Sequence, residues 1–487
     1  MTEAPNWLEV AKSLKEDGIA EPVLWLGDDR NYKKAKEAFG DSVESMLTFV
    51  HRPYQLEDIN YKGEYGEFFL SEHYIRSKDI CMKMMDRLDL YGTFSRIDRE
   101  VYFHSIIIWT LKKFSKTKPD FLLMAEAPHS HAQYLIYEIC SWLDIPSFKF
   151  NRWTLAPLIF LQNMKTDEII FKGEKKFDSI QKDMMGLVMD YVDDVIENHD
   201  KYEISYMKVH RSKKKFPGNL KRIINEDIPE ILNDIKHNVG NRLLKRWSSI
   251  NPYELNIISR LRIQSKRAKN LYNHHAQYVE KGIMGRPYVY FALHYEHERS
   301  TNPDGGHFHD QFKALQFLRN ILPESIDIIV KEHPSQFLVV GRGSRGRSPL
   351  FYKLIKNIKG IKIVDSNANS IKLLKNSIFV STITGTIALE AAILGKLALT
   401  FGSTWFPGCP NTISWSETLS YQSILNTRIK GVDEVRAYLE SHQTKHSVIG
   451  FQNGSVMRRF QHLNSDNFRK REKEGVLDLI KVMIKNV

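Results

Sequence analysis

The sequence has few cysteines and lacks a long apolar run. Its 487 residues include only 3 cysteines, Cys81, Cys140 and Cys409, which lie far apart. This spacing excludes a disulfide framework and a paired Cys-x-x-Cys metal site. No apolar segment approaches the roughly 18–20 residues that cross a bilayer. Residues 1–17 also lack the basic start and apolar core of a signal peptide, so we expect a cytoplasmic protein.

The sequence has fewer acidic than basic side chains. It contains 70 Lys and Arg against 58 Asp and Glu, a formal net charge of +12, which favours anionic partners. Much of the excess lies between residues 208 and 269. We interpret this stretch either as a solvated helical face or as a patch that holds the protein peripherally on the anionic inner membrane. Because no zinc finger, RNA-recognition signature or helix-turn-helix pattern accompanies these charges, we expect no nucleic-acid partner.

The length and the order of apolar segments predict an α/β protein with more than one domain. In residues 1–175 strand and helix patterns alternate, which indicates an N-terminal Rossmann-like domain with an open parallel sheet. Strands are expected at 22–26, 45–50, 121–125 and 145–150. Residues 176–285 show charged helical patterns instead, and we interpret them as a basic helical connector or insertion.

The alternation is more regular in residues 286–430, which are expected to form a second Rossmann-like domain. Strands are expected at 288–293, 326–330, 361–364, 377–380 and 397–401. The stretch 341–348, rich in Gly and Arg, is expected to be a flexible basic loop. Residues 431–487 are expected to form C-terminal helices that pack back on the N-terminal domain. Ligands of such sheets bind beyond the carboxyl ends of the strands, where candidate residues should lie.

Two candidate phosphate-binding elements follow expected strands of the C-terminal domain. The strand at 326–330 is followed by Lys331, His333 and Pro334. The side chains of Lys331 and His333 can both donate hydrogen bonds to phosphate oxygens. A second element, between a strand and a helix, is a turn of small residues. It comprises Ser381, Thr382, Thr384, Gly385 and Thr386. Amides at the start of a helix favour anions, although ordinary helix capping is an equal alternative. Glu390 lies one turn into that helix and is a candidate partner of a ribose.

Carboxylates follow two further strands. His294, Glu296 and Glu298 come after the strand at 288–293 and, in an extended chain, would project to one side. A carboxylate there can act as a nucleophile or stabilise an oxocarbenium-like transition state. We expect no metal, since the cluster has no defined ligand pattern. Glu126, with His129 and His131 nearby, follows the strand at 121–125 and is a candidate general base for an acceptor hydroxyl. A helix-capping turn is the alternative interpretation of this segment.

These pieces occur in an order that resembles the bacterial capsule polysaccharide synthesis family. The order is Lys331 to Pro334, the small-residue turn, Ala-Leu-Glu-Ala at 388–391, Gly395-Lys396 and then Phe401-Gly402. The family includes the β-Kdo transferases, which use CMP-Kdo. The resemblance covers residues 286–410 and extends weakly to Glu126. The His-Pro element is also similar to one in bacterial sialyltransferases and in CDP-glycerol glycerophosphotransferases.

The resemblance implies a GT-B scaffold, with two Rossmann-like domains facing a cleft, and glycosyltransferase activity without a cofactor. A nucleotide sugar, CMP-linked, would be the donor, and an oligosaccharide or glycolipid the acceptor. Lys331, His333 and the small-residue turn would hold the donor phosphate, and Glu390 would lie near the ribose. In the retaining Kdo transferases an Asp stands after the first strand of this domain, with Gln four residues earlier. Here Glu298 and His294 occupy those places.

Three other functions remain open at the level of sequence. A transferase of the CDP-glycerol type would move a polyol phosphate rather than a sugar. A non-catalytic assembly protein could retain the same scaffold, although the presence of the candidate carboxylates and the phosphate-binding elements argues against it. Binding of nucleic acid through the basic connector would be non-specific and salt-sensitive.

Overall fold

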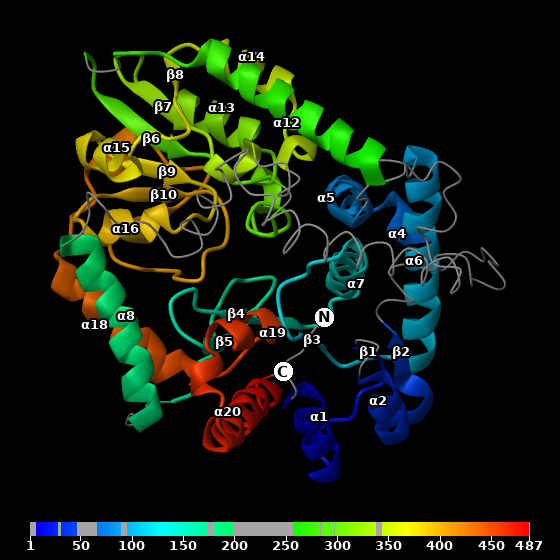
Figure 1. Ribbon diagram of the computed structural model, residues 1–487. Helices are drawn as coiled ribbons and strands as arrows, with labels where there is room; N and C mark the ends of the chain where they lie inside the picture. The colour runs from blue at the N-terminus through cyan, green and yellow to red at the C-terminus, as the bar shows by residue number, and fades with distance from the viewer. Residues whose placement is uncertain are drawn as a thin grey trace.

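The computed structural model of the protein has two sheet-containing lobes (Figure 1). It describes residues 6–27, 31–45, 66–88, 95–173, 179–197, 257–282, 285–296, 298–337 and 343–486. One lobe is formed by residues from about 257 to 446, and the other combines the N-terminal residues with the end of the chain. Both lobes mix helices and strands, which confirms the α/β class.

The C-terminal lobe contains a six-stranded parallel sheet in the order β11-β10-β9-β6-β7-β8. Its strands are β6 (Tyr288–Ala292), β7 (Asp327–Lys331), β8 (Ile361–Val364), β9 (Val380–Thr382), β10 (Ala398–Thr400) and β11 (Thr412–Ser414). Read from β8, this is the Rossmann order 3-2-1-4-5-6. The order in which the strands are added reverses between β6 and β9, which creates a crevice at their carboxyl ends. The strands predicted at 288–293, 326–330, 361–364 and 397–401 are confirmed. The strand predicted at 377–380 begins only at Val380, and β11 was not predicted.

Helices bury both faces of this sheet, because each strand alternates its apolar side chains between the faces. Val289 and Phe291 of β6 join a core with the helices on one face, whereas Tyr288 and Tyr290 join the core on the other. The helices of this lobe are α12 (Ile257–Tyr278), α13 (Gln311–Ile321), α14 (Pro349–Lys356), α15 (Ser370–Asn376), α16 (Ile387–Ile393), α17 (Tyr421–Leu425) and α18 (Val432–His446). In Figure 1, α12, α13 and α14 lie on one side of the sheet and α15 and α16 on the other.

The N-terminal lobe has a mixed sheet rather than the predicted open parallel one. Its four strands, in the order β12-β5-β4-β3, are β3 (Leu122–Met124), β4 (Ser147–Arg152), β5 (Leu158–Asn163) and β12 (Ser447–Ile449). Only β3 and β4 are parallel. The first two strands, β1 (Trp25–Gly27) and β2 (Val43–Ser45), pair in a separate parallel sheet. The rest of the strand predicted at 45–50 lies outside the described residues.

Helices of the N-terminal lobe pack around these sheets. They are α1 (Asn6–Glu16), α2 (Tyr32–Phe39), α4 (Gly66–Leu70), α5 (Glu72–Leu88), α6 (Arg96–Thr117) and α7 (His131–Trp142). A capping box fixes the start of α7, since Ser130 accepts the Gln133 amide and the Gln133 side chain accepts the Ser130 amide. Helices α5, α6 and α7 share one core. Polar side chains of α5 also contact the C-terminal lobe, as described below.

The last residues of the chain belong to the N-terminal lobe. After α18, β12 pairs with β5, and α19 (Gly454–Arg459) and α20 (Asp466–Ile484) follow. Val476 and Leu479 of α20 share a core with Val10 and Leu14 of α1, and Figure 1 shows the two helices side by side. The chain thus crosses between the lobes more than once, and residues far apart in sequence line the space between them.

The predicted connector at 176–285 is described only at its ends. Helix α8 (Ser179–Glu197) packs on α16 and α18, and α12 packs on α14. Most of the basic stretch 208–269 lies outside the described residues. Of its cations, Lys266, Arg267 and Lys269 are on α12 and exposed. Among the described residues no helix is long and apolar enough to span a membrane.

Candidate active site

A cavity of about 840 Å³ lies at the carboxyl ends of β6, β7 and β9, where the strand order reverses. Open α/β sheets bind their ligands at such a switch point. Residues of the N-terminal lobe, including Arg152, Trp153 and Arg459, line its opposite wall. The cavity is therefore a space shared by both lobes, large enough for a small-molecule ligand.

Lys331 and His333 lie together at the end of β7 and line this cavity. The Lys331 Nζ donates to the Ser370 Oγ at 2.8 Å, which fixes the ammonium at the start of α15. The His333 Nδ1 accepts the Ser335 amide at 3.2 Å. This bond places the proton of a neutral ring on Nε2, so the imidazole is a donor through that atom. Pro334 begins the short 3-10 turn that supplies the Ser335 amide.

The turn between β9 and α16 brings Thr382, Thr384, Gly385 and Thr386 to the same cavity. Ser381 differs, because it is fully buried within β9 and does not line the cavity. A side chain at position 385 would be too close to its surroundings, since its Cβ would lie 2.8 Å from the Thr382 Oγ1. The turn therefore needs glycine there. The first amides of a helix have no partner within it, so the cavity side of this turn suits an anion.

Glu390 lines the cavity from α16 and is buried. Burial raises the pKa of its carboxyl to about 7, and the nearby Lys331 ammonium opposes that rise. Glu390 and Lys331 thus form a pair whose charge changes near neutral pH. A carboxyl at this place can bond a hydroxyl of a ligand in either protonation state.

His294, Glu296 and Glu298 do not project to one side, contrary to the prediction. Strand β6 ends at Ala292, and the following residues turn rather than continue extended. His294 and Glu298 line the cavity, whereas Glu296 is buried beside Arg347 and Lys83. The difference arises because a turn breaks the alternation that an extended strand would impose.

His294 supports the small-residue turn. Its Nε2 accepts the Thr384 amide at 3.1 Å and lies 3.0 Å from the Thr382 Oγ1. Burial lowers the pKa of the imidazole to about 4, with Glu296 opposing and Arg347 assisting that shift. The ring is therefore neutral at physiological pH, and an Nε2 that accepts an amide proton suits only the neutral form. We interpret His294 as a positioning residue of the turn.

Glu298 is exposed to the cavity, although the walls around it are close enough to raise the pKa of its carboxyl through desolvation. Ser300 Oγ donates to it at 3.1 Å, and Arg299 and Arg87 oppose the rise in its pKa. Of the three residues after β6, Glu298 alone presents a carboxylate to the cavity.

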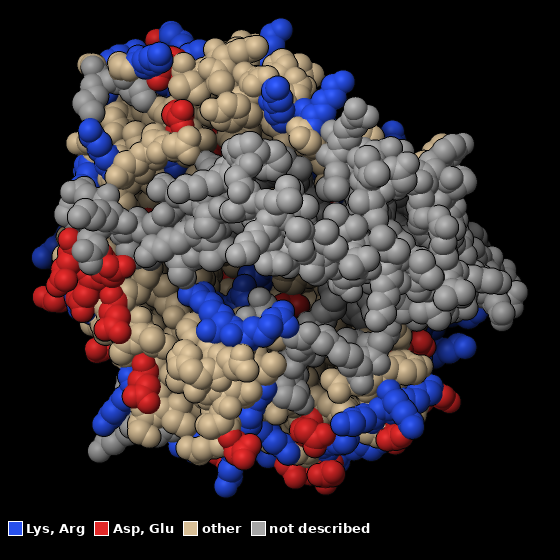
Figure 2. Space-filling model, in the orientation of Figure 1, with Lys and Arg blue, Asp and Glu red and all other residues tan. Residues whose placement is uncertain are grey.

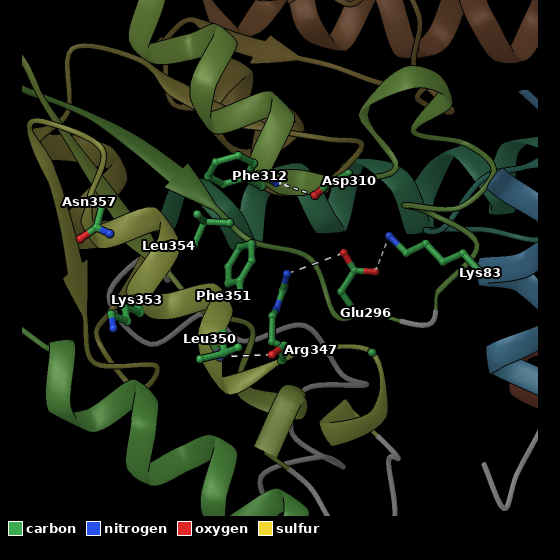
Figure 3. Close-up of a pocket in the computed structure, with 12 residues that line it drawn as sticks. Lys83, Glu296, Asp310, Phe312, Arg347, Leu350, Phe351, Lys353, Leu354 and Asn357 are labelled. Carbon is green, nitrogen blue, oxygen red and sulfur yellow. Dashed lines mark hydrogen bonds and ion pairs between the residues drawn. The ribbon is translucent and has the colours of Figure 1, made fainter. Parts of the chain in front are cut away.

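Arg347 and Lys83 are residues that the sequence interpretation missed. Figure 3 shows Glu296 between them, with Lys83 reaching from α5 of the other lobe. The Glu296 Oε2 lies 3.3 Å from the Lys83 Nζ, and its Oε1 lies 3.7 Å from an Arg347 nitrogen. Burial raises the pKa of Glu296, but these cations outweigh it and keep the pKa below its usual value. A second cavity of about 460 Å³ adjoins this network.

Arg347 also holds the two loops that carry the cavity imidazoles. One guanidinium nitrogen donates to the His294 carbonyl at 3.0 Å, and its Nε lies 3.0 Å from the Glu332 Oε2. The prediction of a flexible basic loop at 341–348 is therefore wrong for Arg347, which is buried and lies 4.3 Å from the Phe351 ring centroid. Residues 341 and 342 lie outside the described residues. An ion pair with a buried carboxylate overrides the local preference of a Gly-rich segment.

The N-terminal candidates do not reach the cavity lining. Glu126 is buried, accepts a bond from the Asn453 Nδ2 at 3.0 Å and lies 3.4 Å from the His129 Nε2. Burial raises its pKa, but His129 and Asn453 outweigh burial and bring the pKa to about 2. Such a carboxylate is a weak base, so the structure does not support Glu126 as a general base. His131 is fully buried in α7 against Tyr102 and is part of the core.

Cations from both lobes line the cavity beyond those predicted. They are Lys149, Arg152, Arg299 and Arg459. Lys149 and Arg152 stand on β4, and the sequence had placed no strand across residues 151–152. Figure 2 shows Lys and Arg side chains gathered near the middle of this face of the molecule. No group of three or more His, Cys, Asp or Glu side chains in the described part of the chain is arranged to hold a metal ion.

The fold and the cavity define an α/β protein of the GT-B type, in which two lobes face a shared ligand cavity. Residues 252–442 match the family described as capsule polysaccharide biosynthesis protein. The predicted resemblance to that family is thus confirmed for this region, which contains β6 to β11 and most of the cavity residues. No curated protein matches the sequence.

Several solved structures are similar to the chain at low identity. The β-Kdo 2,7-transferase of KpsC from Thermosulfurimonas dismutans is 16% identical over 36% of this chain and 52% of its own, with a TM-score of 0.24. The β-Kdo 2,4-transferase of the same protein is 14% identical over 65% of this chain and 78% of its own, also at 0.24. The wall teichoic acid polymerase TagF is 14% identical over 46% of this chain and 49% of its own, at 0.19. The chain spans about half the length of the first and third structures. Because all three TM-scores are below 0.5, the fold assignment rests on sheet order and cavity.

Proposed function

We propose that the protein is a glycosyltransferase of bacterial surface polysaccharide synthesis, either of capsule or of lipopolysaccharide. It transfers a sugar from a nucleotide donor to an oligosaccharide or glycolipid acceptor. The observation that carries the proposal is the convergence of Lys331, His333 and the turn at 382–386 on one cavity at the switch point of the sheet. The family match of residues 252–442 supports the same conclusion.

The donor is a CMP-activated acidic sugar, of the Kdo or nonulosonic acid kind. This part of the proposal rests on the resemblance of the His-Pro element to enzymes that use cytidine nucleotides. Lys331 supplies a fixed positive charge and His333 a donor through Nε2, beside the amides at the start of α16. Together they offset the charge of the departing nucleotide, so that transfer proceeds without a metal ion.

Glu298 acts on the anomeric carbon. It presents the carboxylate that attacks this carbon or stabilises its positive charge, and a nucleophilic role would retain the anomeric configuration. His294 keeps the phosphate-binding turn in place through the Thr384 amide. Glu390 bonds the ribose. The acceptor enters from the wall formed by the N-terminal lobe, and both lobes together exclude water that would hydrolyse the donor.

Calorimetric titration with CMP tests the phosphate-binding assignment. CMP should bind the wild type, and His333→Ala should weaken binding at least about tenfold, because it removes a charge-assisted hydrogen bond. His462→Ala is the matched control, since this exposed histidine does not line the cavity. Equal binding of CMP by His333→Ala and the wild type would overturn the assignment.

A scan of donors tests the reaction. CMP-Kdo, another CMP-nonulosonate, a UDP-sugar and CDP-glycerol are each incubated with the protein and glycan acceptors, with and without EDTA. We expect sugar transfer from a CMP-linked donor that EDTA does not reduce. Transfer from CDP-glycerol alone would replace the proposal with a polyol-phosphate transferase. Nucleotide binding without any transfer would favour a non-catalytic assembly protein.

A further inference from the structure

The cavity carries positive charge beyond that of the proposed phosphate site. Lys331 and His333 stand at the end of β7, whereas three arginines that line the same cavity belong to other segments. Arg152 ends β4, Arg459 ends α19, and Arg299 follows β6 in the C-terminal lobe. The two lobes thus contribute guanidinium groups to one region.

Each of the three arginines is held differently. A terminal nitrogen of Arg459 donates to the Thr154 carbonyl at 3.0 Å, which places its side chain beside the end of β4 and Arg152. The Arg299 Nε lies 3.5 Å from an Asp304 oxygen, while its NH1 is buried and bonds to no described residue. Arg152 forms no ion pair with any residue that the structure describes. All three side chains line the cavity, so their guanidinium groups can meet a ligand there.

The charges of the three groups act on one another. Burial, together with the charges of Arg299 and Arg459, lowers the pKa of Arg152 to about 10, and Glu126 opposes this shift. Like charges held together in a partly enclosed space disfavour the empty state, and an anion that bonds several of them removes the conflict. Guanidinium groups match the geometry of carboxylate and phosphate, which accept paired hydrogen bonds.

The geometry points to a second anion subsite, formed by Arg152, Arg299 and Arg459, which binds a carboxylate or phosphate group apart from the Lys331–His333 site. Its position next to Glu298, the neighbour of Arg299 in the chain, puts the bound anion close to the reacting centre. The existence of the subsite is independent of the proposed function. The source of the anion, either the acceptor or the transferred sugar, rests on that function.

Titration of inorganic phosphate into the full-length protein tests the subsite. We expect two binding events in the wild type and one in Lys331→Met, which keeps the arginine subsite. In Arg152→Gln and Arg459→Gln the event that survives in Lys331→Met should weaken at least tenfold. Arg471→Gln is the matched control, because Arg471 is half-exposed on α20, where it pairs with Glu474.

Melting temperatures distinguish a ligand-binding role of Arg152 from a structural one. If Arg152 serves a ligand, removing one of three repelling cations should leave the melting temperature of Arg152→Gln unchanged or higher, and phosphate should raise it less than in the wild type. Arg152→Lys, which keeps the charge, should restore part of the phosphate affinity. Phosphate binding equal to that of wild type in both Arg152→Gln and Arg459→Gln would overturn the subsite. A lowered melting temperature in Arg152→Gln, with normal phosphate binding by Arg459→Gln, would overturn it as well.

Kinetics with an active donor identify the source of the anion. If the acceptor carries it, Arg152→Gln should raise the KM of the acceptor about tenfold and leave donor hydrolysis without acceptor unchanged. If the transferred sugar carries it, the KM of the donor should rise and hydrolysis should slow, while inhibition by CMP stays the same. Failure of CMP to bind would count against the proposed donor alone, since the phosphate titrations do not depend on it.

Discussion

The Arg347 Nε lies 3.0 Å from one carboxylate oxygen of Glu332, and the other oxygen of Glu332 accepts the His333 amide at 2.8 Å. The same guanidinium donates to the His294 carbonyl. One buried cation therefore joins the loops after β6 and β7, and through Glu296 it reaches Lys83 of the other lobe. The arrangement of the cavity imidazoles depends on contacts outside the cavity.

Replacing Arg347 should damage both stability and function. Arg347→Met leaves Glu332 and Glu296 buried without their shared cation, and such losses typically cost about 3–5 kcal/mol of unfolding free energy. Urea unfolding measures the loss. Arg471→Met, which breaks a half-exposed pair with Glu474, should cost about 0–1 kcal/mol. Equal losses in the two variants would show that the Arg347 network contributes little.

Protonation of His294 should destabilise the protein in acid. Because burial lowers its pKa from 6.5 to about 4, the unfolded chain binds a proton between these values and the folded protein does not. Unfolding free energy should fall as pH drops from about 6.5 to 4, by on the order of 3 kcal/mol from this residue. His294→Gln keeps an oxygen that can accept the Thr384 amide, and should lose this part of the acid dependence.

The matched comparison for His294 is another buried histidine. His442 lies in the core on α18 and does not itself line the cavity, and burial lowers its pKa to about 4 as well. His442→Gln should reduce the acid dependence to a similar extent but leave CMP affinity unchanged. An unaltered stability profile between pH 4 and 6.5 in His294→Gln would contradict the neutral, buried state of His294.

Glu390 should make nucleotide binding depend on pH near neutrality. Burial raises its pKa from 4.5 to about 7, so the carboxyl ionises as pH rises through 7 and then competes with phosphate for Lys331. CMP affinity should therefore fall between pH 6 and 8 in the wild type and remain flat in Glu390→Gln. The raised pKa also means that unfolding free energy declines as pH rises from 4.5 to 7, and the same variant should lack this decline. A CMP titration series across this range measures the first effect; an identical slope in both proteins would exclude the competition.

Glu298→Gln should affect turnover more than donor affinity. The amide keeps the size of the side chain but cannot attack the anomeric carbon, so we expect kcat to fall roughly 100-fold or more. The KM of the donor should change little, because the phosphate is held elsewhere. Glu417→Gln, at an exposed position outside the cavity lining, is the control. Wild-type kcat in Glu298→Gln would remove this residue from the chemistry.

The sequence predicted the C-terminal sheet well and the N-terminal one only in part. Strands β6 to β10 are apolar runs between helices, since parallel strands covered on both faces bury every side chain. In contrast, β12 pairs with β5 across more than half of the chain, with Ser447 opposite Phe160. Local patterns carry no information about such long-range pairing, so the mixed sheet could not be foreseen.

The candidate site was likewise predicted only in part. Lys331, His333 and Thr384 were predicted as site residues because they directly follow strands, where the geometry of parallel sheets brings side chains to a common edge. Arg152 and Arg459 escaped notice, since each belongs to an element of the other lobe. Ser381 was also predicted, but it is fully buried within β9 and does not line the cavity, whereas its neighbour Thr382 does.

The amino-acid sequence by itself determines the order of strands and helices in the C-terminal lobe and the candidate phosphate-binding residues at their ends. Both follow from local apolar patterns and turn residues. The tertiary structure alone decides which charges meet. From the sequence, Arg347 is predicted to lie in a flexible loop, but in the structure it pairs with Glu332 and Glu296. Glu126 is predicted to be a general base, but in the structure it contacts Asn453 and His129. Burial and partners set the protonation and orientation of a side chain, and both depend on residues that are distant in the chain.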